Sequence, residues 1–147
     1  MVGILVVSHG GLADALIASV QSLVGNLQRT RGVSIWPREK EEEVKDRVRK
    51  EIAEVDDGDG VVILTDILGG TPTNLSFSFL EKERVEVVTG VNMPMLLTLS
   101  SYRKGGSLRE IGRLVKKSGR RSIILANELL GFKRRRWIRL PIEVDLF

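Results

Sequence analysis

The chain of 147 residues contains one histidine, and its neighbours give it a setting for chemistry. His9 follows the apolar run Ile4–Val7 and precedes two glycines, so we expect it where a buried strand meets a turn. Neutral imidazole is a nucleophile near pH 7, because its unperturbed pKa is about 6.5. A histidine nucleophile divides a group transfer into two easier steps. His9 is therefore the first candidate for a covalent catalytic residue.

A second stretch has the same form, because the apolar run 61–65 ends at Asp66 and a Gly-Gly-Thr-Pro turn follows. A phosphohistidine needs an acceptor that fixes the imidazole tautomer, which Asp66 could supply. It also needs a donor to the phosphoryl oxygens, which Thr71 could supply. Helices starting near Gly11 and Pro72 would point their positive ends at the anion. Backbone that a bulky anion can approach closely would come from Gly10, Gly11, Gly69 and Gly70.

Each of these residues also has an ordinary structural interpretation. Asp66 could be a turn or helix cap, and Thr71 suits the N-cap of the helix that Pro72 begins. Asn74 could satisfy local backbone groups, and Gly-Gly pairs are common in turns. Rival motifs are absent from the sequence: we find no GxxxxGK[ST] loop, no GxGxxG after a strand and no GxSxG elbow. Sites for ATP, for NAD and for a serine nucleophile therefore lose support.

The composition fits one ordinary domain. Hydrophobic residues make up 42% and charged residues 29% of the chain. No cysteine is present, and with a single histidine a zinc site would need mostly carboxylates, so we expect no metal and no cofactor. No apolar run reaches the ~20 residues that span a bilayer. No basic segment precedes the first apolar run, so we expect a cytoplasmic protein.

The net charge of +4 has a local origin near the C-terminus. Lys133–Arg136 and Arg139 supply the basic surplus, and Trp137 lies among them. Basic residues beside a tryptophan can bind phosphates and stack on bases. A short cluster of this kind is more often a solvated end or a docking patch, so we do not favour nucleic-acid binding.

Strands and helices alternate along the sequence. The patterns predict strands over 1–7, 33–36, 61–65, 85–89 and 122–126, and helices over 12–24, 39–55, 71–82, 93–99 and 107–117. Ser107 and Glu110 form a capping box, and alternation from Ile138 on suggests one more extended segment. The order predicts an α/β fold with a doubly wound, mostly parallel sheet and helices on both faces. Ligands bind beyond the carboxyl ends of such strands, where His9, Asp66 and Gly90 lie.

Three segments together resemble the enzyme IIA component of the mannose class of the bacterial phosphoenolpyruvate-dependent sugar phosphotransferase system. They are Ile4–Gly10 (ILVVSHG), Leu64–Asn74 (LTDILGGTPTN) and Val88–Leu97 (VTGVNMPMLL). The resemblance extends from Met1 to about Ala126. It implies a homodimer and a phosphohistidine relay in which no metal or nucleotide takes part.

The resemblance also implies roles for single residues. His9 would accept the phosphoryl group from the phosphocarrier protein HPr and pass it to a histidine of a IIB protein. Asp66 would orient the ring, attack would come from the ring nitrogen that Asp66 does not hold, and the Thr71 hydroxyl would contact the phosphoryl group. Pocket and partner-docking positions at this edge are assigned to Leu68, Pro72, Asn74, Asn92, Met93 and Pro94.

The chain departs from the family pattern in several places. Positions 11 and 68 hold glycine and leucine where some members carry tryptophan, which could change docking and leave the pocket rim less apolar. The family completes its sheet edge with a C-terminal strand exchanged between subunits, for which Ser122–Ala126 is the candidate. The sequence from Gly131 has no counterpart, so we divide the chain into a IIA domain, 1–130, and an extension, 131–147. We expect IIB on a separate chain, and membrane components IIC and IID only as indirect partners.

Two alternatives remain beside the relay. One is a phosphotransfer subunit for a dihydroxyacetone kinase, which has a similar fold and a histidine after its first strand; the GGTPTN and GVNMPM segments favour the mannose class. The other is a non-catalytic regulatory module on the same fold. Such a module would not need His9, Asp66 and Thr71 to converge. The sequence does not choose between uptake and regulation, and it does not name the sugar.

Overall fold

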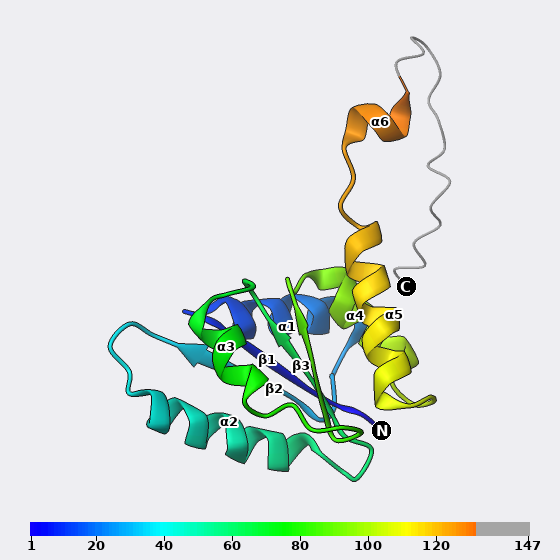
Figure 1. Cartoon of the computed structure of the whole chain (residues 1–147). Coiled ribbons are helices and arrows are strands. Elements are labelled where there is room, and N and C mark those ends of the chain that lie inside the picture. Colours follow the sequence, from blue (N-terminus) through cyan, green and yellow to red (C-terminus); the bar gives the residue numbers. More distant parts are fainter. Residues whose placement is uncertain (132–147) are drawn as a thin grey trace.

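A computed structural model describes residues 1–131 of the chain. Four parallel strands form one sheet in this range, in the order β2-β1-β3-β4 (Figure 1). The central strands are β1 (Gly3–His9) and β3 (Val61–Thr65), and the edges are β2 (Thr30–Ile35) and β4 (Val85–Thr89). The chain runs from β1 to one edge and then returns past β1 to the other. The carboxyl ends of β1 and β3 therefore flank the point where the strand order reverses.

Helices cover both faces of the sheet. One face carries α1 (Leu12–Val24), α4 (Met93–Tyr102) and α5 (Leu108–Arg121), and the other carries α2 (Glu41–Val55) and α3 (Thr71–Phe77) (Figure 1). A short helix, α6 (Ala126–Leu130), lies away from this body. None of the described helices has both the length and the apolar character that a membrane crossing requires.

The two central strands explain how the sheet holds two cores. Ile4 and Val6 of β1 pack into the core beneath α1, α4 and α5, whereas Leu5 and Val7 pack into the core beneath α2 and α3. All four side chains are fully buried. Alternate residues of a strand point to opposite faces, so a strand covered on both faces must be apolar throughout. The near-continuous apolar run before His9 follows from this arrangement.

The predicted α/β fold is confirmed, with shifted element ends. Four of the expected strands and all five expected helices are present, and the capping box forms, with Ser107 Oγ accepting from the Glu110 N–H. The helix expected over 71–82 ends at Phe77. Beyond it, the N–H groups of Phe79 and Leu80 donate to carbonyls three residues back, which tightens the chain into turns before β4.

The segment Ser122–Ala126, expected as a fifth strand, pairs with no strand of the described chain. Instead α5 continues to Arg121, and α6 begins at Ala126. The segment between them leads away from the body, and its side chains Ile123, Ile124 and Leu125 are 81%, 43% and 61% exposed (Figure 1). We call Ser122–Leu130 the arm. Its apolar character suggested a buried strand, but it forms no strand within residues 1–131, and its three apolar residues 123–125 are exposed there.

The extension 131–147 lies outside the described residues except for Gly131. The predicted extended segment from Ile138 and the basic cluster 133–139 therefore stay predictions.

Candidate functional site

The parallel pairing of β1 with β3 brings His9 and Asp66 into contact. Val7 lies opposite Thr65 in the register, so the residues that follow both emerge at one edge of the sheet. Asp66 Oδ2 lies 2.8 Å from His9 Nδ1 and accepts a second hydrogen bond, also 2.8 Å, from the His9 backbone N–H. The Asp66 side chain is 7% exposed, whereas the His9 side chain is 48% exposed. A buried carboxylate thus holds an accessible imidazole.

Hydrogen bonds keep the Asp66 carboxylate ionised. Burial raises its pKa, but donors from the His9 backbone, the His9 ring and the Ile67 backbone outweigh burial, so the pKa lies below its ordinary value. Since folding lowers this pKa, the group contributes stability above its ordinary pKa and loses it as pH falls through the folded value. An ionised carboxylate can only accept, so Nδ1 must carry a proton. In the neutral form of the ring, the free lone pair therefore lies on Nε2.

Gly70 keeps the space beside Nε2 of His9 open. A Cβ atom at Gly70 would lie 2.9 Å from His9 Cε1 and 3.6 Å from Nε2, so any side chain there would crowd the approach. Gly10 has a φ of 51°, which allows the sharp turn directly after His9. Cβ atoms at Gly11 and Gly69 would meet nothing within 4 Å, so these two glycines border open surface.

A pair of buried hydroxyls, which the sequence reading missed, fixes the turn that carries Asp66. Thr73 Oγ1 donates to the Ile67 carbonyl at 2.7 Å and lies 2.6 Å from Thr65 Oγ1. A hydroxyl has one proton, so Thr65 must be the donor to Thr73. The pair joins the end of β3 to the start of α3 across the turn. The spacing of two threonines along the sequence does not show whether their hydroxyls meet across a turn, so spacing alone gave no signal for this contact.

Ser8, the residue before His9, fixes the turn that follows β1. Ser8 is fully buried, and its Oγ accepts a 2.8 Å hydrogen bond from the N–H of Ala13 in the first turn of α1. The sequence reading placed no role on Ser8. This hydrogen bond ties the end of β1 to α1, and so it sets how His9 and Gly10 leave the strand.

The Gly-Gly-Thr-Pro turn is arranged differently from the prediction. The N-cap of α3 is Gly70, so the expected N-cap role of Thr71 is wrong, and Thr71 is the first residue of the helix. Thr71 is exposed, and within residues 1–131 its hydroxyl has no hydrogen-bond partner. Pro72 is buried, and Asn74 Nδ2 donates to the Gly69 carbonyl at 3.4 Å. Leu68 lies at the outer edge of the turn and is 71% exposed.

The hydrogen bonds of the predicted docking residues Asn92, Met93 and Pro94 lie within α4 or join it to α5, and they do not involve His9 or Asp66. Asn92 Oδ1 accepts from the Met95 N–H and caps α4, while its Nδ2 donates to the Gly119 carbonyl of α5. Met93 and Pro94 begin α4 and are half-buried. This segment fastens α4 and α5 beside the site, and its docking role stays a prediction.

The chemistry that the site supports is nucleophilic. A neutral imidazole with a free, accessible nitrogen and a carboxylate behind it is the arrangement that covalent histidine catalysis requires. Among residues 1–131, no group of three or more histidine, cysteine, aspartate and glutamate side chains is placed to hold a metal ion.

Comparison with known proteins gives one family. Residues 3–116 match the family model EIIA-man, described as "PTS system fructose IIA component". The mannose-specific EIIAB component of Escherichia coli K12 is 30% identical over 124 residues, which are 83% of this chain and 38% of that relative. The chain thus spans well under half of that relative's length. The fructose-specific EIIA component of Bacillus subtilis strain 168 is 27% identical over 131 residues, covering 88% of this chain and 90% of the relative.

A solved structure gives the same picture of the fold. The PTS IIA protein associated with the fucose utilization operon from Streptococcus pneumoniae is 31% identical, with a TM-score of 0.76. The match covers 87% of this chain and 95% of the solved one.

The tautomer of His9 is directly measurable, because the chain has no other histidine. At a pH where the ring is neutral, we expect ¹⁵N NMR to show a protonated Nδ1 and an unprotonated Nε2. In Asp66→Ala the acceptor is lost, and the proton should move toward Nε2. A wild-type ring protonated on Nε2 would contradict the geometry.

The hydroxyl pair predicts that two substitutions at position 73 lower the free energy of unfolding by different amounts. Thr73→Val leaves the Thr65 hydroxyl and the Ile67 carbonyl without their partner, which should lower the free energy of unfolding by roughly 1–3 kcal/mol. Thr73→Ser keeps the hydroxyl and should lose less. Urea denaturation measures both variants. A greater loss in Thr73→Ser than in Thr73→Val would mean that the buried methyl group of Thr73, which valine keeps, and not its hydroxyl, holds the turn.

Proposed function

This chain belongs to the EIIA-man family of phosphotransferase-system IIA components, and from that premise we propose that it carries a phosphoryl group on His9 during sugar uptake or its regulation. The donor is phospho-HPr and the acceptor is a IIB component. The observation that most supports this proposal is the 2.8 Å contact between Asp66 Oδ2 and His9 Nδ1, which leaves Nε2 as the nucleophile.

The transfer has two symmetrical halves. In the first, His9 Nε2 attacks the phosphorus of the donor phosphohistidine, an N–P bond forms on His9, and the N–P bond of the donor breaks. In the second, a histidine of IIB attacks the same phosphorus, and His9 leaves as the neutral ring. Positive charge develops on the His9 ring as its N–P bond forms. The Asp66 carboxylate at Nδ1 stabilises that charge, much as an aspartate stabilises an imidazolium in a catalytic triad.

The phosphoryl oxygens meet donors from both turns. The exposed Thr71 hydroxyl is the side-chain donor, and it follows Gly70, whose backbone lies against the ring. The first turn of α1, which begins at Leu12, adds its positive helix end on the other side. Close approach of the anion is possible because the backbone around it is formed by Gly10, Gly11, Gly69 and Gly70.

The relay is favoured over the alternatives on specific grounds. A regulatory module without chemistry has no need of a buried carboxylate hydrogen-bonded to an exposed imidazole. The relatives described above are sugar phosphotransferase components, so we keep the sugar system over a dihydroxyacetone kinase. Membrane components IIC and IID would meet the phosphoryl group only after IIB.

We also propose that the protein acts as a homodimer with exchanged arms. Within residues 1–131 no strand pairs with the outer edge of β4, and a groove of about 520 Å³ runs beside it. Apolar side chains of the groove include Phe77 and Val87, and α5 supplies a basic side with Arg109, Arg113, Lys116 and Arg120. The arm of a second copy offers Ile123–Leu125 to this edge, and an added strand would complete the sheet. Exchange then covers the apolar side chains that each arm exposes.

Phosphorylation tests the relay. With phosphoenolpyruvate, enzyme I and HPr, we expect one acid-labile phosphoryl group per chain. His9→Ala should take up none, and Asp66→Ala should fold but accept phosphate more slowly by about 10²- to 10⁴-fold, because its ring is no longer held in the reactive tautomer. Labelled phosphate and acid treatment measure both. Undiminished uptake by His9→Ala would remove the nucleophile from the proposal, and a wild-type rate in Asp66→Ala would remove the orienting role.

The arm exchange predicts the mass in solution. Sedimentation equilibrium should give twice the chain mass of 16.4 kDa for the wild type. Ile123 is 81% exposed, so Ile123→Asp costs its own chain little, yet it should yield monomers. Leu23→Asp, at the exposed end of α1, is the matched control and should stay dimeric. A dimeric Ile123→Asp protein would exclude the arm from the interface.

A further inference from the structure

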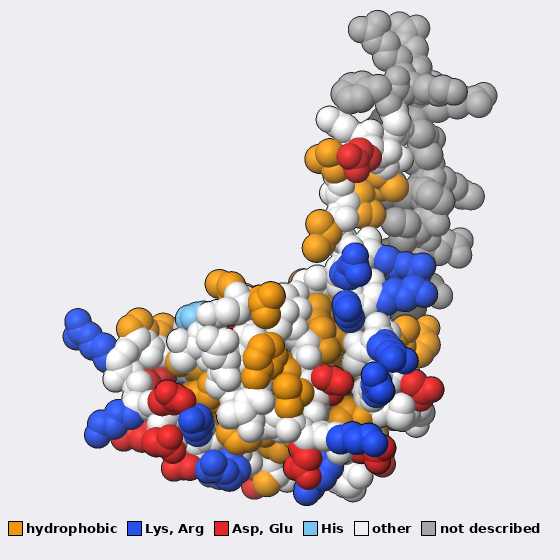
Figure 2. All heavy atoms as spheres, viewed as in Figure 1, with side chains coloured by type: hydrophobic (Ala, Val, Ile, Leu, Met, Phe, Trp, Pro, Cys, Tyr) orange, Lys and Arg blue, Asp and Glu red, His pale blue; other side chains and the backbone are white. Residues whose placement is uncertain are grey.

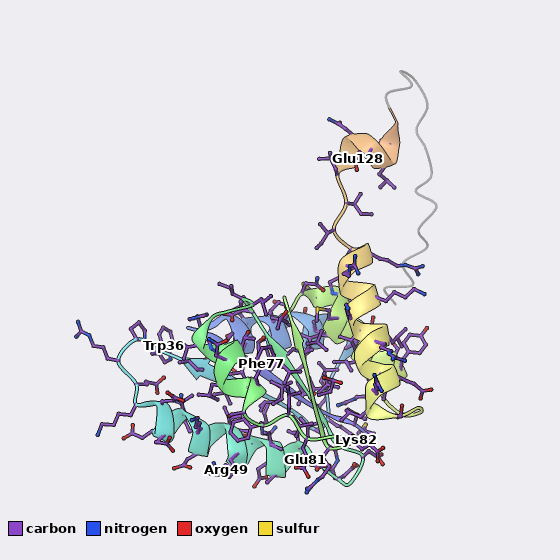
Figure 3. All side chains as sticks on the ribbon, viewed as in Figure 1. Trp36, Arg49, Phe77, Glu81, Lys82 and Glu128 are labelled. Carbon is purple, nitrogen blue, oxygen red and sulfur yellow. The ribbon has the colours of Figure 1, made fainter. Side chains whose placement is uncertain are left out.

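One large aromatic side chain beside the His9 turn has no part in the chemistry described so far. Trp36 follows β2, and the register pairs His9 with Ile35, so Trp36 lies next to Gly10. Its ring atoms Cζ3 and Cη2 lie 3.5 and 3.7 Å from where a Cβ atom of Gly10 would be. Trp36 is 55% exposed and is labelled in Figure 3. It stands at the edge of the site with more than half of its surface in water.

The loop that carries Trp36 is held in place. The Trp36 backbone N–H donates to Glu39 Oε2 at 2.7 Å. Glu39 is in turn held by Arg47 of α2, whose guanidinium lies 3.1 Å from Glu39 Oε1 and donates to the Ser34 carbonyl. Pro37 fixes its own φ and restricts the backbone of Trp36, the residue before it. The indole is therefore presented on ordered backbone, which lowers the entropy cost of binding a partner.

Other exposed apolar side chains come from the two turns that flank His9. Ile67 and Leu68 follow Asp66, and Leu12 follows Gly11; they are 60%, 71% and 43% exposed. Figure 2 shows the single histidine at the surface, with apolar side chains nearby. We call Leu12, Trp36, Ile67 and Leu68 the apolar rim. An accessible nucleophile surrounded by such a rim is suited to contact with a surface.

The position of the hollows favours a protein over a small molecule as the partner. His9 lines neither of two hollows, of about 520 and 380 Å³, that residues 1–131 form away from it. The larger one reaches the apolar rim only at Leu68. Small ligands bind in concave pockets, whereas protein interfaces use apolar patches anchored by aromatic side chains such as tryptophan.

We propose that Trp36 is the residue through which the apolar rim recognises a folded phosphoprotein donor. The inference rests on the proposed function, since it takes phospho-HPr as that donor. Trp36 does not act on the ring of His9, which Asp66 already orients. It determines how well the donor protein docks, and so it affects transfer from a protein but not transfer from a small donor.

Two phosphoryl donors separate these effects. Trp36→Ala should lower kcat/KM for transfer from phospho-HPr by about tenfold or more, as expected for an interface anchor. Its rate with phosphoramidate, a small donor that phosphorylates imidazole, should equal the wild-type rate. Trp36→Phe should recover most of the loss. Tyr102→Ala is the matched control: Tyr102 is 63% exposed at the opposite edge of the sheet, where its neighbour Arg103 donates to the Val2 carbonyl.

The outcomes are distinct. If Trp36→Ala changes neither rate, or lowers both equally, Trp36 is not a docking residue and the inference is overturned. If the wild type accepts phosphate from phosphoramidate but never from phospho-HPr, the proposed donor is wrong. In that case the inference falls together with the relay.

Fluorescence gives a second readout that does not depend on transfer. The chain has two tryptophans, so Trp137→Phe leaves Trp36 as the single indole. Titration with unphosphorylated HPr should shift and quench its emission at a saturable concentration. An emission spectrum that stays unchanged while HPr binding is seen by calorimetry would place Trp36 outside the interface.

Discussion

The hydrogen bond between the buried Asp66 carboxylate and Nδ1 of His9 is the contact on which the rest of the site depends. It fixes one proton on Nδ1 and thereby leaves the lone pair of the neutral ring on Nε2. A charged carboxylate that is 7% exposed is costly unless donors surround it, and here both backbone and ring donate to it. The fold provides these donors because β1 and β3 pair in parallel and end together at the point where strand order reverses.

The supporting contacts act on the two turns and not on the reacting atoms. Ser8 ties the first turn to α1, and the hydroxyls of Thr65 and Thr73 hold the second. Gly70 leaves the approach to Nε2 free. Buried hydrogen bonds fix the two turns at the strand ends, and this keeps the His9 ring and the Asp66 carboxylate at a set distance. The site is therefore rigid behind the ring and open in front of it.

Much of this could be predicted from sequence, for a physical reason. Strands buried on both faces must be apolar, so the runs before His9 and Asp66 revealed β1, β3 and the edge where they meet. The features that the sequence did not predict depend on contacts between residues that lie apart in the sequence. The Thr65–Thr73 contact crosses a turn, and the arm pairs with no strand in the part of the chain that the structure describes. Gly11 and Leu68 suggested a rim poor in apolar surface, yet the parallel register places Trp36 beside Gly10 and restores an aromatic side chain there.

The central claim is that Asp66 selects Nε2 of His9 as the atom that carries phosphate. The most direct measurement is NMR of the phosphorylated protein, in which ³¹P couplings to the ring protons and ¹⁵N shifts of the ring distinguish the two phosphohistidine isomers. We predict phosphate on Nε2, with Nδ1 still protonated and bonded to Asp66. Phosphate on Nδ1 would contradict the account, because that atom could be reached only if the contact with Asp66 were broken.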